Sequence, residues 1–175
     1  MKGFKREDVA YYFNQVRPSF IRLGADEVTY HFHIMIRFEL EKDLIEGRLN
    51  VKELPEIWNQ KYHETLGIKP KRVSEGVLQD THWSEGSFGY FPTYSLATAL
   101  SAMIKSRFEK DSGQTISQML KTTEGVNTIQ AWLKRKVHRY GDAYKSKDLI
   151  RKSFGEDLTS KYLLEYLESK YHEIY

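Results

Sequence analysis

Apolar side chains recur at helical spacing around more than one side of the segment 26–46. One side carries Val28, Phe32, Met35, Leu40 and Leu44, and another carries Tyr30, Ile34, Phe38 and Ile45. A helix that is apolar on more than one side is typical of the middle of a helical bundle. Asp26 is a good N-cap for such a helix, and Gly47 supplies its C-terminal stop. The pattern therefore predicts a long central helix that needs neighbours on two sides.

The same period predicts further helices along the chain. They cover residues 7–17, residues 54–67, a helix opened by Pro92, residues 115–121, a helix capped by Asn127 and stopped by Gly141, residues 146–155 and a last helix over 158–171. No run alternates with the period of two that a strand would show. We therefore expect an all-α fold, a helical bundle with one long functional loop. A chain of 175 residues is expected to form one domain, 1–175.

Composition excludes several classes of protein. Hydrophobic residues make up 40% and charged residues 29%, which is typical of a soluble globular protein. The chain has no cysteine, so it has no disulfide and no thiolate metal site, and we expect a cytoplasmic location. The apolar runs are too short to span a bilayer, and the N-terminus lacks the apolar core of a signal peptide.

A net charge of +3 is a weak sign of nucleic-acid binding. The basic run that includes Lys134, Arg135, Lys136 and Arg139 could form a nucleic-acid patch. It is better explained as a solvated helix face with charges that suit the helix C-terminus. We therefore expect neither nucleic acid nor a membrane as a partner.

Residues 68–91 show no clear period, although they carry many polar and aromatic groups. Loops of this length are uncommon in compact domains and are often functional. His82 is the only residue in this loop that exchanges protons near neutral pH, and Gln79 and Asp80 precede it. Tyr90 and Tyr94 could donate hydrogen bonds to a developing oxyanion. The alternative is a packed corner, in which backbone groups satisfy the histidine.

A second polar pair stands in the connector before the central helix. Arg22 offers a fork suited to a carboxylate, and Asp26 follows it closely. The two could equally form a local salt bridge across the start of the helix. Spacing alone does not name a reaction for either group of residues.

Two short motifs resemble the signatures of one family. "IRLGAD" (21–26) and "GVLQDTHW" (76–83) match the patterns Ile/Val-Arg-x-x-Ala-Asp and Gly-x-x-Gln-Asp-x-His-Trp of the carboxypeptidase Taq family of zinc metallocarboxypeptidases. Neighbouring text such as "LPEIWNQKYHETLG" and "HWSEGSFGYFPTYSLA" is also close to that of the family, and the resemblance covers nearly the whole chain. It implies that this chain is part of a larger metallopeptidase-like α fold.

The resemblance also implies a function, the release of single residues from peptide C-termini. In the family, zinc (or cobalt) activates the attacking water. The loop would be the wall of the active site that faces the zinc. Chemistry then assigns catalytic roles to His82 and Tyr94. Substrate-binding roles go to Arg22, Asp26, Gln79, Asp80 and Tyr90.

The family's zinc motif, His-Glu-x-x-His, is missing from this sequence. His63-Glu64 begins it, but Gly67 stands where the second histidine is needed, and His31 and His33 are spaced to point to different sides of a helix. We therefore expect no metal ligand and no cofactor in this chain, which resembles the C-terminal portion of such an enzyme.

That portion could have either of two functions. One is the substrate-binding part of a peptidase, inactive without a zinc-bearing N-terminal half. The other is a non-catalytic module that binds peptides or proteins. The apolar central helix further predicts a homo-oligomer or a complex with the missing half.

Overall fold

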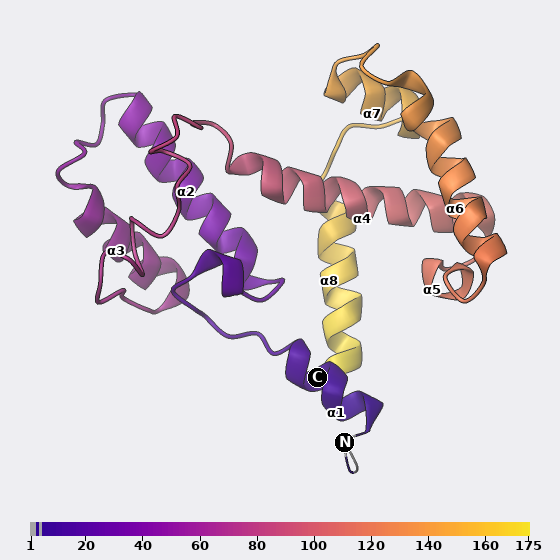
Figure 1. Ribbon diagram of the computed structural model, residues 1–175, viewed down its shortest axis with the longest axis horizontal. Coiled ribbons are helices and arrows are strands. Elements are labelled where there is room, and N and C mark those ends of the chain that lie inside the picture. Colours follow the sequence, from indigo (N-terminus) through magenta and orange to yellow (C-terminus); the bar gives the residue numbers. More distant parts are fainter. Residues whose placement is uncertain (1–2, 4) are drawn as a thin grey trace. The chain divides into compact units, whose positions relative to one another are not determined.

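The fold is all-α, as the periodicity predicts. The computed structural model describes residue 3 and residues 5–175, and it contains no strand in this part of the chain (Figure 1). Its elements are α1 (Arg6–Phe13), the 3₁₀ helix η1 (Arg22–Gly24), α2 (Thr29–Ile45), α3 (Leu54–Leu66), α4 (Pro92–Ser112), α5 (Ile116–Met119), α6 (Thr123–Lys136), the 3₁₀ helix η2 (His138–Tyr140), α7 (Ser146–Phe154) and α8 (Lys161–Ile174). None of the described helices is both long enough and apolar enough to cross a membrane.

The helices form two compact units, which are described separately. The first contains residues up to 96 together with 170–175, and the second contains residues 97–169. The single domain expected from the chain length stays a prediction.

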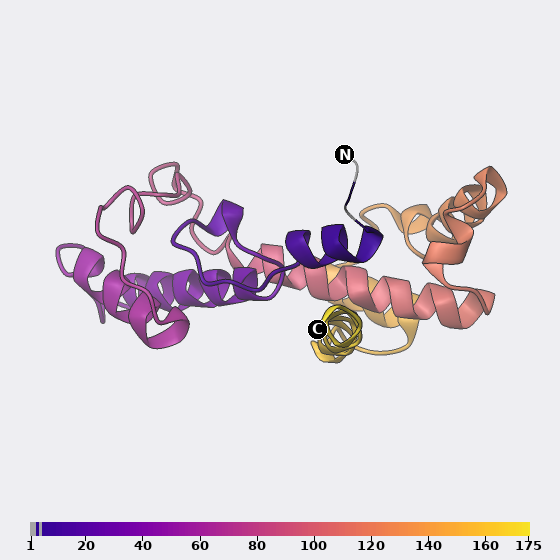
Figure 2. The ribbon, with the colours of Figure 1, turned by 90° about the horizontal axis from the view of Figure 1, so that it is seen from below.

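In the first unit, α2 and α3 lie side by side (Figures 1 and 2). Their shared core consists of Ile36, Leu40, Leu54, Trp58, Tyr62 and Leu66. Gly67 ends α3 with a φ of 71°, a left-handed conformation that suits glycine, and its N–H donates to the carbonyl of His63. The chain then runs through residues 68–91 in turns without a helix, so the long loop predicted from the sequence is present.

Helix α2 differs from its prediction in its start and in its faces. It begins at Thr29, and Asp26 caps it from outside by accepting the N–H groups of Val28 and Thr29 at 3.0 and 2.9 Å. The two predicted apolar faces do not match the observed burial, because each contains both buried and exposed side chains. Leu40 and Ile34 are buried, but Met35 and Phe38 are 47% and 48% exposed.

The start of α6 is also corrected. Thr122, and not Asn127, is the N-cap, and its hydroxyl accepts the N–H of Gly125 at 3.0 Å. Threonine and asparagine are both good caps, so the sequence offered two starts. The first turn contains a glycine and few apolar groups, so the helical period of apolar residues does not extend to it. Helix α1 likewise ends at Phe13, earlier than the predicted Arg17.

The second unit packs around two small centres. Leu163 of α8 contacts Ala99 and Ala102 of α4. Trp132 of α6 packs edge-on against Phe108 at 5.5 Å between ring centroids and stacks on Phe154 at 6.3 Å.

Candidate functional site

In the first unit, a single carboxylate lies between two buried arginines. Asp80 receives Nε and Nη2 of Arg22 on Oδ1, at 3.0 and 2.6 Å, and Nε of Arg37 on Oδ2, at 2.6 Å. The side chains of Arg22 and Arg37 are 4% and 0% exposed, and that of Asp80 is 10% exposed. Charge-assisted bonds of this length are strong where water is excluded, so this cluster ties the loop to η1 and α2.

Gln79 joins the two motif segments through their backbones. Its Oε1 accepts the N–H of Arg22 at 2.9 Å, and its Nε2 donates to the carbonyls of Phe20 and Glu75, both at 2.9 Å. Backbone bonds on both sides of a side-chain amide fix the register of the two segments. The motifs therefore meet although about 57 residues separate them.

The arginines determine the ionisation of the carboxylate. Burial alone would raise the pKa of Asp80, but the charges and hydrogen bonds of Arg37 and Arg22 lower this pKa below its usual value. Burial also opposes the charge of Arg22, yet Asp80 and Tyr30 raise the pKa of its guanidinium. Asp80 and Arg22 are therefore both charged at neutral pH.

Behind Arg37 lies a second set of buried polar groups. Its Nη1 donates to the hydroxyl of Tyr62 at 3.0 Å and to the carbonyl of His33 at 2.8 Å. Because the Tyr62 oxygen accepts from Arg37, we assign its proton to the bond with Nδ1 of His33, which is 2.9 Å away. This tautomer leaves Nε2 of His33 buried without a partner among the described groups.

Glu41 of α2 anchors the loop near its far end. Its Oε1 accepts from Nε1 of Trp83 at 3.1 Å and from the N–H of Gly89 at 2.6 Å. Gly89 has a φ of 78°, a left-handed conformation that glycine adopts readily. The loop is thus attached to α2 at two points, Asp80 and Glu41.

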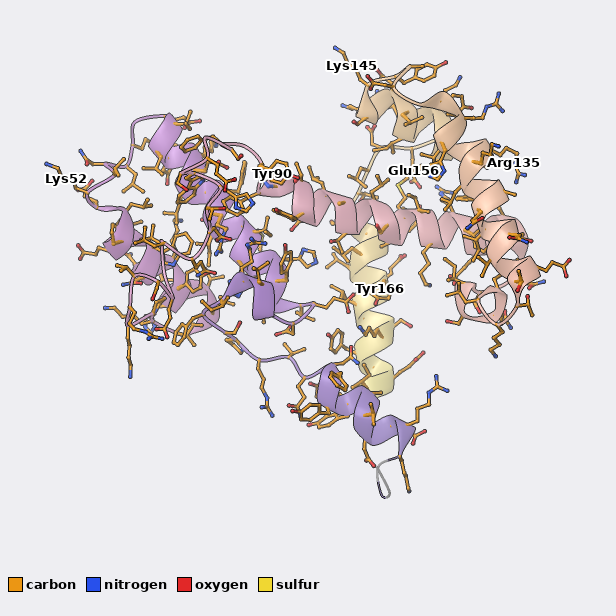
Figure 3. The ribbon with its side chains drawn as sticks, in the orientation of Figure 1. Lys52, Tyr90, Arg135, Lys145, Glu156 and Tyr166 are labelled. Carbon is orange, nitrogen blue, oxygen red and sulfur yellow. The ribbon has the colours of Figure 1, made fainter. Side chains whose placement is uncertain are left out.

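His82 and Tyr94 form the second polar group of the site. Nε2 of His82 lies 2.9 Å from the Tyr94 hydroxyl, and the imidazole stacks on Phe91 with 4.4 Å between centroids. Both polar side chains are half-buried. Tyr90 is half exposed where the loop joins α4, and its ring lies 5.8 Å from that of His82 (Figure 3).

Phe91 connects the two polar groups. Its ring is 1% exposed and lies 5.6 Å from the guanidinium carbon of Arg22 and 5.4 Å from that of Arg37. The guanidinium carbon of Arg22 also lies 5.1 Å from the Tyr94 ring. One buried ring thus holds the imidazole on one side and two cations nearby.

Most residues predicted for the site lie together: Arg22, Gln79, Asp80, His82, Tyr90 and Tyr94. Asp26 has a different environment, because its carboxylate caps α2 and accepts the N–H of Arg17 at 3.0 Å. Arg22 pairs with Asp80 and not with Asp26, so the local salt bridge considered for the connector is replaced by a long-range one. The functional roles of all seven residues stay predictions.

Three residues of this network were missed by the motifs: His33, Arg37 and Tyr62. Arg37 did leave a signal in the sequence. It is a charged residue inside the otherwise apolar stretch "HIMIRF", and a charge at such a position needs a buried partner. The signal did not identify that partner.

The described residues contain no ligand set for the zinc that the resemblance implies. Among the described residues, no three histidine, aspartate or glutamate side chains come close enough to hold an ion. The acidic groups at the site are already bound, Asp80 by two arginines and Glu41 by Trp83 and Gly89. The residues present therefore do not fit a catalytic zinc, and no chemical step is assigned to one.

Comparison with known proteins gives consistent matches. The family described as carboxypeptidase Taq (M32) metallopeptidase matches residues 1–171. Thermostable carboxypeptidase 1 of Pyrococcus furiosus is 44% identical over 98% of this chain and 34% of its own length. Carboxypeptidase 1 of Bacillus subtilis is 41% identical over 99% of this chain and 34% of its own length. The crystal structure of the M32 carboxypeptidase from Deinococcus radiodurans R1 superposes with a TM-score of 0.90 at 32% identity, over 98% of this chain and 34% of that one.

These matches and the fold define the class: the chain shares the all-helical fold of a family of metallopeptidases. The chain belongs to the carboxypeptidase Taq (M32) family. It spans about a third of the length of the curated relatives it matches and corresponds to the C-terminal portion of the family enzyme.

Proposed function

We propose that this chain is the substrate-binding portion of an M32 carboxypeptidase and holds the C-terminal end of a peptide. One observation carries the proposal: the two motif segments close on Asp80 and bring Arg22 next to the His82–Tyr94 pair. A site of this kind offers a cation for a carboxylate and neutral donors for a carbonyl oxygen. Peptide C-termini present both groups, one residue apart.

Arg22 is assigned to the terminal carboxylate. A guanidinium has five N–H groups. Asp80 uses the one on Nε and one on Nη2, and Tyr30 uses one on Nη1. In the described structure this leaves one N–H on each terminal nitrogen, a spacing that suits a bidentate carboxylate. Because Arg22 is 4% exposed, the ring of Tyr30 or Tyr94 has to move when a carboxylate enters.

His82 and Tyr94 are assigned to the carbonyl oxygen of the bond to be cleaved. An imidazole and a hydroxyl in contact use one proton for the bond between them, and the other proton can be donated to an oxyanion that forms beside them. Phe91 holds the imidazole plane, and Glu41 holds the loop through Trp83, so little reorganisation is needed. Tyr90 and Gln79 shape the same wall.

Hydrolysis itself is assigned to an assembly with a zinc-bearing part of the family fold. The isolated chain would bind no catalytic zinc and release no amino acid, because its residues do not fit the metal. The lack of cysteine supports a cytoplasmic location.

A second candidate is a peptide-binding module without catalysis. It is favoured by the distribution of the groups: the arginine–aspartate cluster lies within this chain, and the described residues contain no metal ligand set beside it. This candidate shares the peptide-binding step and differs in turnover.

One assay tests the proposal and separates the candidates. The full chain is mixed with the part of Bacillus subtilis carboxypeptidase 1 that precedes its matched third, and amino-acid release from a blocked peptide is measured with zinc. We expect turnover in the mixture and none from either part alone. His82→Ala should lower kcat about 10²- to 10³-fold with little change in KM. Arg22→Met should mainly raise KM.

His63→Ala is the matched control, because His63 is exposed on α3 and lies outside the site. It should leave both constants unchanged. Turnover by the isolated chain with stoichiometric zinc would contradict the proposal, as would equal effects of the two histidine substitutions. Peptide binding by a mixture that never turns over would select the module.

A further inference from the structure

Arg37 belongs to neither motif, yet its side chain is more deeply buried than those of Arg22 and Asp80. Its side chain is 0% exposed. Nε donates to Oδ2 of Asp80, Nη2 lies 2.6 Å from the same oxygen, and Nη1 is used by Tyr62 and His33. The guanidinium carbon also lies 4.7 Å from the Trp58 ring. A substrate cannot touch this residue, so any role it has is exerted through Asp80.

Arg37 and Arg22 share one carboxylate, that of Asp80. Asp80 gives Oδ1 to Arg22 and Oδ2 to Arg37, so two positive charges face one negative charge. The other polar neighbours of Arg37 add no charge at neutral pH. Burial raises the pKa of Tyr62, and burial together with Arg37 and Arg22 lowers the pKa of His33 to about 4.

Two further carboxylates near this cluster, Glu41 and Asp26, accept hydrogen bonds from neutral donors and form no ion pair with Arg22 or Arg37. Glu41 binds Trp83 and Gly89, and Asp26 caps the helix start. Among the described ion pairs, those of Arg22 and Arg37 both involve Asp80 alone. Since the site excludes water, the charge of Arg37 offsets that of Asp80 strongly, and this leaves Arg22 able to attract an anion.

We propose that Arg37 is a positioning residue that makes Arg22 a receptor for carboxylates, by holding Asp80 at its second oxygen and offsetting its charge. Without Arg37, Asp80 would neutralise Arg22 and leave it little attraction for a second carboxylate. The inference rests on the proposed function, since it concerns the substrate carboxylate assigned there to Arg22. It adds a residue that determines specificity for free over blocked C-termini.

The test compares two ligands on the full chain. The probes are an N-acetylated tripeptide with a free C-terminal carboxylate and the same tripeptide as its amide, titrated by calorimetry. We expect the wild type to bind the acid more tightly than the amide. Arg37→Met should reduce this preference about tenfold or more, a typical effect of one close buried charge. Arg48→Met, a change in an exposed ion pair with Asp43, is the matched control and should keep it.

The double variant Arg37→Met/Asp80→Asn separates charge from structure. It removes one positive and one negative charge together, so Arg22 again faces no full countercharge, and the preference for the acid should return. A purely structural role of Arg37 predicts no such return. Circular dichroism verifies that each variant is folded. Should Arg37→Met not fold, Arg37→Gln replaces it, because its amide still donates a hydrogen bond without the charge.

The outcomes are distinguishable. Preference for the acid retained by a folded Arg37→Met or Arg37→Gln overturns this inference alone. Preference lost in the single variant and not regained in the double one also overturns it. A wild type that binds acid and amide equally overturns the carboxylate role of Arg22 in the proposed function, and the inference falls with it.

Discussion

At the scale of single residues, His33 shows how burial controls protonation. Its ring is fully buried on α2, accepts the Tyr62 proton on Nδ1 and has no partner for Nε2 among the described groups. A charged imidazole would lie near two arginines in a site without water. Burial first, and then Arg37 and Arg22, lower the pKa of His33 from 6.5 to about 4. The folded chain therefore keeps this histidine neutral where the unfolded chain would protonate it.

The stability of the protein should therefore depend on pH between about 4 and 6.5. In this range the unfolded state binds more protons than the folded state, so the free energy of unfolding rises with pH. The contribution of His33 is absent below pH 4, complete above pH 6.5 and about 3 kcal/mol in size. His33→Asn keeps an acceptor for Tyr62 and cannot titrate, so its urea unfolding should show a flatter pH dependence.

His63→Asn provides the comparison for this measurement. His63 is exposed on α3 and lies outside the buried site, so this variant makes the same substitution without altering the surroundings of His33. Equal slopes for wild type and His33→Asn would show that His33 is charged in the folded chain.

At the scale of the helices, α5 and α6 meet closely at Gly125. A Cβ at this position would lie 2.0 Å from the carbonyl oxygen of Met119 and 2.6 Å from its carbon. These are backbone atoms that cannot turn aside. The glycine therefore permits the contact between the end of α5 and the first turn of α6, where Thr122 caps the helix.

Gly125→Ala should destabilise the second unit, although alanine is usually the better helix former by about 1 kcal/mol. Overpacking against a backbone atom costs roughly 1–3 kcal/mol, which outweighs that gain. Urea unfolding followed by circular dichroism measures the difference. Gly24→Ala is the control, because nothing lies within 4 Å of a Cβ there and no loss is expected. Gly125→Ala at wild-type stability would disprove the close approach.

At the scale of the whole molecule, α2 carries an apolar stripe that the described chain leaves exposed. Its members are Phe32, Met35, Phe38 and Ile45, which are 37% to 67% exposed. Exposed apolar patches on one helix are typical of surfaces that bind another protein. The relatives are about three times as long as this chain, so the family fold has further chain to pack against it.

We expect the purified chain to self-associate through this stripe when no other partner is present. Met35→Lys/Phe38→Lys should shift light scattering towards the mass of a monomer, because a charge opposes burial of the stripe. Val51→Lys is the control, since Val51 is also exposed and stands outside α2. A wild type that is monomeric at high concentration and binds no apolar dye would contradict the expectation.

Much of the fold follows from the sequence. Periodicity and the stops at Gly67 and Gly155 predicted the helices, because a helix repeats its environment every 3.6 residues and needs only local bonds. The stop predicted at Gly141 was wrong, since α6 ends at Lys136 and Gly141 follows η2. The same local logic failed at α6, where two residues could cap the helix. It also failed on α2, where the number of apolar sides was visible but the neighbours that cover them were not.

The candidate site, like the fold, could be predicted from the sequence only in part. The motifs named Arg22, Gln79, Asp80 and His82 from the sequence by itself, since each lies in a short recognisable string. Only the tertiary structure showed that Arg22 pairs with Asp80 and that Arg37 shares that carboxylate. An ion pair between residues far apart in the chain depends on which surfaces pack together. Side-chain chemistry states that a buried charge needs a partner, and packing decides which partner it gets.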